Sequence, residues 1–136
     1  MTQRLEKRPY GLESTPEELR LIEERISLLE PDLVLYREVP VMSTFQFEVF
    51  ERRLRELGDR KGYRLLVDLS ESDPPPAALR ARIRDFFLKE PITKAALFTE
   101  RNMLINIAAK FVVAGIGFKS WTIHKTREEA IAAIKA

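Results

Sequence analysis

The sequence has 136 residues, which is enough for one globular domain whose core buries about two-thirds of the chain's surface. Its 23 basic and 21 acidic residues leave a net charge of +2, and because the two signs are mixed along the chain, this charge does not indicate a nucleic-acid-binding protein. The absence of cysteine excludes disulfides, thiolate nucleophiles and cysteine metal ligands.

The N-terminal region is polar and lacks the apolar core of a secretion signal. No run in the chain reaches the roughly 18–20 apolar residues of a membrane span. We therefore expect a soluble, cytoplasmic protein without a transmembrane segment. Residues 1–13 are expected to be poorly ordered or loosely docked. Ser14-Thr15-Pro16, followed by two glutamates, predicts a helix start, because hydroxyls cap free amides and proline suits the first turn. Residues 1–24 are thus an N-terminal extension with a short helix.

The next segment leaves two alternatives open. Arg25–Leu29 is either the last turn of the first helix or a short strand. Glu30-Pro31-Asp32 is a good turn, and Leu33–Val39 is rich in β-branched and aromatic residues. We favour a strand at Arg25–Leu29 that forms a hairpin with Leu33–Val39.

From residue 32 onward, an extended apolar run is followed by an amphipathic helix four times. This alternation predicts a single α/β domain over residues 25–136, with a small mixed sheet of four to five strands and about four helices packed on it. The expected strand and helix pairs are Asp32–Val39 with Ser43–Leu57, Tyr63–Leu69 with Pro76–Lys89, Ala95–Thr99 with Arg101–Ala114, and Phe118–His124 with Arg127–Lys135.

The third of these helices, Arg101–Ala114, is almost apolar all round. Met103 and Ile107 lie on its flank, next to a narrow polar stripe. Either neighbouring elements bury this flank, or it contacts a partner, which could be a second copy of the chain in a homodimer. Methionine suits adaptable contact surfaces.

Residues able to carry chemistry are few and scattered. His124 is the only histidine and lacks an obvious partner. Asp68 lies at the end of a predicted strand, and Glu100 lies at the same edge of the sheet. An enzyme would need such a carboxylate with a raised pKa in a cleft. Because no catalytic set, glycine-rich phosphate loop or metal-ligand cluster is evident, we expect no enzyme activity, no cofactor and no metal.

Two segments carry a family resemblance. They are Arg64-Leu-Leu-Val-Asp-Leu-Ser and Ser120-Trp-Thr-Ile-His-Lys-Thr-Arg-Glu-Glu-Ala-Ile-Ala-Ala-Ile. Together with the element order, they resemble the STAS domain of sulfate transporters and anti-sigma-factor antagonists, and more closely its bacterial STAS-like (SpoIIAA-like) branch. The resemblance covers roughly residues 25–136. It implies a regulatory, signalling role through binding another protein.

In antagonist members of this family, a serine at the start of the helix after the central strand is phosphorylated to switch partner binding. Ala77 or Ala78 stands at that position here, so the resemblance does not carry the switch over. Ser70 and Ser72 lie earlier in the loop. The alternative function is a carrier or sensor of a small apolar ligand such as a lipid, suggested by the eight phenylalanines. The residues predicted to contact the partner are Ser70, Ser72, Asp73, Ala77, Met103 and Ile107.

Overall fold

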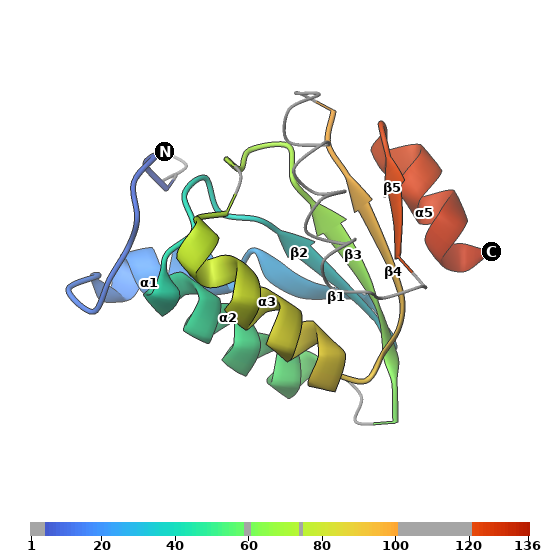
Figure 1. Ribbon diagram of the computed structural model, residues 1–136, viewed down its shortest axis with the longest axis horizontal. Coiled ribbons are helices and arrows are strands. Elements are labelled where there is room, and N and C mark those ends of the chain that lie inside the picture. Colours follow the sequence, from blue (N-terminus) through green and yellow to red (C-terminus); the bar gives the residue numbers. More distant parts are fainter. Residues whose placement is uncertain (1–4, 59–60, 74, 101–120) are drawn as a thin grey trace.

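The described chain forms one mixed five-stranded sheet with helices on both faces (Figure 1). The computed structural model describes residues 5–58, 61–73, 75–100 and 121–136. The predicted small α/β domain is confirmed. The elements are α1 (Pro16–Glu23), β1 (Ile26–Glu30), β2 (Leu33–Arg37), α2 (Thr44–Leu57), β3 (Tyr63–Asp68), α3 (Ala77–Lys89), β4 (Ile92–Phe98), β5 (Trp121–His124) and α5 (Arg127–Lys135).

The strands lie in the sheet in their order along the chain, from β1 to β5. β1 pairs with β2 antiparallel, with Ile26 opposite Tyr36, and β2 to β5 are parallel to one another. The hairpin that we favoured is therefore confirmed, and the segment after α1 is a strand rather than a last helical turn. β4 begins at Ile92, three residues before the predicted start at Ala95.

The capping chemistry predicted for the first helix recurs at two other helix starts. Thr15, Ser43 and Thr126 stand before α1, α2 and α5, and each hydroxyl accepts a hydrogen bond from the amide three residues later. For α1 and α2 the side chain at that later position also bonds back to the amide of the cap. α3 differs, because Pro76 precedes it and supplies no side-chain cap.

The sheet separates two hydrophobic cores, with α2 and α3 on one face and α5 on the other (Figure 1). β3 serves both, since Leu65 packs into the first core and Leu66 into the second, each with 0% of its surface exposed. Side chains alternate between the faces of a strand, so consecutive residues in the middle of a strand buried on both faces, here Leu65 to Val67, are apolar. This burial explains the unbroken apolar run in the sequence.

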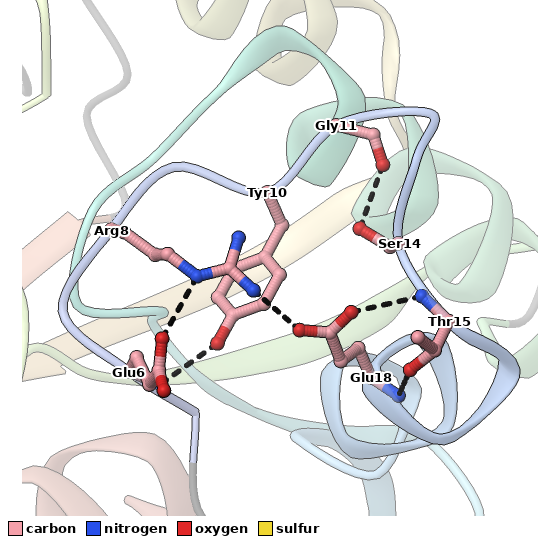
Figure 2. A network of polar contacts seen from close by, with 7 residues as sticks. All are labelled: Glu6, Arg8, Tyr10, Gly11, Ser14, Thr15 and Glu18. Atoms are coloured by element: carbon pink, nitrogen blue, oxygen red, sulfur yellow. Dashed lines mark hydrogen bonds and ion pairs between the residues drawn. The ribbon is translucent and has the colours of Figure 1, made fainter.

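Residues 5–13 are docked onto the domain rather than loosely attached. Tyr10 is only 2% exposed. Its hydroxyl accepts from the amide of Glu6, and the Arg8 guanidinium lies 4.0 Å from the centre of its ring (Figure 2). Its carbonyl accepts from the Ser43 hydroxyl over 2.5 Å. The segment is polar in composition, but one aromatic side chain, Tyr10, anchors it to the domain.

The predicted helix Arg101–Ala114 lies outside the described residues, as do residues 118–120 of the last predicted strand. Met103 and Ile107 fall in the same stretch. Their assignment to a partner surface, and the homodimer suggested for that helix, therefore remain predictions from the sequence.

Candidate functional site

The four parallel strands end in register at one edge of the sheet. Arg37, Asp68, Phe98 and His124 are neighbours at the ends of β2, β3, β4 and β5. In open α/β sheets this carboxyl edge is where ligands are usually bound. In the described part of the chain, the segments that follow the strands at this edge carry most of the predicted contact residues.

The central loop, residues 69–73, follows β3 in the middle of this edge. The Asp73 amide donates to the Pro40 carbonyl over 2.9 Å, which ties the end of the loop to the segment after β2. The Asp73 carboxylate lies 3.4 Å from the Lys7 ammonium of the N-terminal segment. That ion pair is well exposed and contributes little to stability. The main-chain bond is therefore the firmer of the two attachments.

The start of the central loop is attached to the opposite side of the edge. The Ser70 amide donates to Asp68 Oδ1 over 2.9 Å, so Asp68 holds the turn after its own strand, which is the structural alternative for this residue. The Ser70 hydroxyl accepts from the Glu100 amide over 3.3 Å. Glu100 Oε1 in turn accepts from the Arg127 amide at the start of α5. One polar chain thus runs from β3 to α5.

Ser72 does not lie on the outer surface of the central loop. It is 2% exposed, and its hydroxyl donates to the Leu69 carbonyl over 3.2 Å. A partner cannot contact this side chain while the loop keeps this conformation, so we remove Ser72 from the proposed contact surface. Ser70 and Asp73 are half-buried and Ala77 is exposed, so these three side chains remain accessible.

A cluster of three buried side chains, Arg25, Tyr36 and Glu38, together with the exposed Glu71, supports the same edge. Glu38 Oε1 accepts from the Tyr36 hydroxyl over 2.5 Å and from the Val39 amide over 3.1 Å. The Arg25 guanidinium donates to the Glu38 carbonyl over 3.0 Å and to Glu71 Oε2 over 3.2 Å. The cluster therefore connects the start of β1, the end of β2 and the central loop.

Burial governs the acidity of this cluster. It raises the pKa of the Glu38 carboxyl to about 7, against lowering contributions from the Tyr36 hydroxyl, the Val39 amide and the Arg25 charge. Burial also holds the pKa of the Tyr36 hydroxyl well above its ordinary value, with the nearby Glu38 adding to the effect. The phenol therefore keeps its proton and donates it in a hydrogen bond to the carboxyl.

The prediction of candidate carboxylates overlooked Glu38 and named Asp68 and Glu100. The alternation of side chains between the two faces of β2 indicated that Glu38 would be buried. Val34 and Tyr36 belong to the core beneath α2, and side chains two residues apart share a face of an extended chain. Glu38 continues that face. Its neighbour Arg37, which is exposed, made the pair resemble an ordinary charged strand end.

His124 has a local contact in the structure. Its Nε2 lies 2.8 Å from the Thr122 hydroxyl, two residues earlier on β5. Within the described ranges, no three acidic or histidine side chains stand close enough together to hold a metal ion. None of the helices in those ranges combines the length and the apolar character needed to cross a membrane.

Four of the eight phenylalanines that suggested an apolar ligand, Phe47, Phe50, Phe86 and Phe87, are packed against one another in the larger core. The Phe50 ring centre lies 4.2 Å from that of Tyr36, 5.6 Å from that of Phe47 and 5.6 Å from that of Phe86. Phe87 continues the cluster toward Trp121, with 5.0 Å between ring centres. Mutual packing accounts for these rings without a ligand. The carrier function stays an untested alternative.

Comparison of the chain with models of known protein families, with curated proteins and with solved structures found no match. The resemblance to the STAS-like family accordingly remains a hypothesis carried by the chain's own residues and element order. What the geometry contributes is a loop at the centre of the carboxyl edge, fixed from several sides, with accessible side chains at its two ends.

Proposed function

We propose that the chain is a non-enzymatic module that binds another regulatory protein through the carboxyl edge of its sheet, as its resemblance to the STAS-like family implies. The observation that carries this proposal is the attachment of the central loop. It bonds to the segment after β2 and to the segment after β4, while Ser70 and Asp73 stay accessible. A loop that is already ordered loses little entropy when a partner binds it.

The start of α3 supplies the second part of the proposed surface. Ala77 is the first residue of α3 and is exposed, as is Ala78 after it. The resemblance places the regulated serine of antagonist proteins at one of these positions. A phosphate there would add charge at a helix start, whereas an alanine cannot be phosphorylated. We therefore expect partner binding without phosphorylation of this position.

The proposal is tested by affinity purification of the tagged full chain from its own source organism, comparing wild type with Ala77→Glu. A glutamate in the first turn of α3 is favourable for the helix, so the fold should be kept, which circular dichroism checks. Ala132→Glu is the matched control, because Ala132 is an exposed alanine on α5. The proposal expects one partner to be recovered with wild type and with the control, and lost with Ala77→Glu. Recovery of the same partner with all three chains would contradict the assigned surface.

Native mass spectrometry of the gently purified chain separates the proposal from its alternative. A second polypeptide in the complex would support the interaction module, and a mass of twice the chain would identify a homodimer. A bound small apolar compound would favour the carrier or sensor instead.

A further inference from the structure

One guanidinium joins the interior of the domain to the central loop. Arg25, whose side chain is 8% exposed, donates both to the Glu38 carbonyl and to the Glu71 carboxylate. Glu71 belongs to the loop and is more than half exposed. Most ion pairs between exposed side chains contribute little, but a pair with one buried partner is harder to replace by water. Arg25 is therefore a buried side-chain attachment of this loop, in addition to its main-chain bonds.

Glu38 is a second acid on which the Arg25 charge acts, since this charge lowers the pKa of the Glu38 carboxyl. The titratable groups that act on its carboxyl are Tyr36, from its own strand, and Arg25, from the start of β1. The adjacent strand β3 contributes the Asp68 carbonyl, which accepts from the Glu38 amide, while the Asp68 carboxylate is engaged by Ser70. Glu71, from the central loop, acts through Arg25. The buried Arg25 guanidinium thus bonds the main chain of one acid, Glu38, and the carboxylate of another, Glu71.

The two protonation states of Glu38 make different demands on Arg25. A neutral carboxyl avoids burying a charge and keeps two contacts, because Oε1 still accepts from Tyr36 and from the Val39 amide. Arg25 is then free to hold Glu71. An ionised carboxylate places a charge in a poorly solvated site, where attraction to a cation is stronger than at the exposed Glu71. Because the pKa of Glu38 is about 7, both states are populated near neutral pH.

We propose that Glu38, Arg25 and Glu71 form a proton-operated latch: loss of the Glu38 proton draws the Arg25 guanidinium away from Glu71 and releases the central loop. The inference deepens the proposed function, on which it rests for the role of the loop. Protonated Glu38 holds the partner surface in the ordered conformation, and ionised Glu38 loosens it.

The test follows the loop itself by nuclear magnetic resonance of the full chain, from about pH 5.5 to about pH 8.5, a range that spans the ionisation of Glu38. The readouts are the amide shift of Asp73 and its protection from hydrogen exchange, taken relative to the unfolded rate at each pH. The expected result is a shift that titrates together with the Glu38 carboxyl carbon. Protection of the Asp73 amide should fall about tenfold as Glu38 ionises, the change that follows from loss of one ordinary hydrogen bond or ion pair.

Two variants decide the mechanism. Glu38→Gln should keep the loop protected across the range and remove the step, because its side chain is always neutral. Glu71→Gln should hold the Asp73 amide at the lower level of protection at every pH, because Arg25 has no loop acid to hold. A step that persists in Glu38→Gln, or a Glu38 titration in wild type that leaves the Asp73 amide unchanged, would overturn the latch.

Glu71 is exposed, so Glu71→Gln is the safer variant if Glu38→Gln does not fold. In that case the comparison of wild type with Glu71→Gln still decides: equal loop protection in the two chains at low pH overturns the proposal. None of these readouts involves a partner. The experiments can therefore overturn the latch while the proposed partner binding holds, and they can support the latch while partner binding fails.

Discussion

The Arg64 guanidinium donates to the Ile134 carbonyl over 3.3 Å, so that a residue of the central strand caps the C-terminal end of the last helix. The same guanidinium holds Asp32 through two bonds and Glu30 through a third. Arg64 therefore joins the hairpin turn, β3 and α5 at the amino edge of the sheet. The planar guanidinium presents several N–H donors in a fixed arrangement, so arginine suits this site better than lysine.

We expect Arg64→Ala to destabilise the domain by about 1–3 kcal/mol, because the substitution removes a helix cap together with a network of charged hydrogen bonds. Arg64→Lys should recover only part of the loss. Urea unfolding provides the measurement. Arg84→Ala is the control, since Arg84 is an exposed residue of α3 whose contact with the adjacent Asp85 is long, and its loss should cost less than about 0.5 kcal/mol. Equal effects at the two positions would contradict the bridging role.

Tyr10 should be the residue that holds the N-terminal segment on the domain. Tyr10→Ala removes a buried ring that packs with Ile22 and Val49, at an expected cost of about 2–4 kcal/mol. The segment should then be cut faster by a protease than in wild type. Leu12→Ala is the matched control, because Leu12 lies in the same segment but is 90% exposed. If Leu12→Ala increases cleavage as much as Tyr10→Ala, the ring is not the anchor.

Glu38 should make the stability of the domain depend on pH in an unusual direction. The ordinary pKa of its carboxyl is 4.5 and the folded value is about 7, so between these values the folded state binds more protons than the unfolded state. Stability from this group is therefore full below about pH 4.5, falls as the pH rises, and is lost above about pH 7. The linked change is at most about 3 kcal/mol.

Comparison of wild type with Glu38→Gln isolates this contribution. The variant should gain stability relative to wild type between about pH 5 and about pH 8, because it has no charge to bury. Urea unfolding at both pH values gives the difference, and Glu128→Gln, an exposed position on α5, provides the background. Parallel stability curves for wild type and Glu38→Gln would show that the Glu38 carboxyl titrates normally.

Any side chain at Gly62 should destabilise the domain. Its φ of +128° is a backbone conformation that residues with a Cβ rarely adopt, and a Cβ there would lie 2.7 Å from Thr93 Cγ2. We expect Gly62→Ala to destabilise the domain by about 1–3 kcal/mol in thermal unfolding. Adding Thr93→Ser, which removes the clashing methyl, should recover only a part, because the backbone strain remains. Full recovery would mean that the clash alone matters.

The features that could be predicted from the sequence are those set by neighbours along the chain. Thr15 and the proline after it predicted a helix start, because a cap acts over three residues, and the apolar run in β3 predicted a strand. The buried Arg25 and Tyr10 could not be predicted in this way. Arg25 meets Glu71 across 46 residues, and Ser43 meets Tyr10 across 33. Only the folded arrangement brings such residues together.

The double burial of β3 has a consequence for how the molecule can move. Because Leu65 and Leu66 hold opposite layers to one backbone, neither layer can separate without uncovering the strand that supports the other, so we expect the slowest hydrogen exchange there. The central loop directly follows β3, which we expect to be the most rigid part of the described chain. Leu69 still belongs to this framework, because its amide donates to the Phe98 carbonyl and its side chain packs against the larger core. We therefore expect motion of the loop to begin at Ser70, one residue beyond the framework.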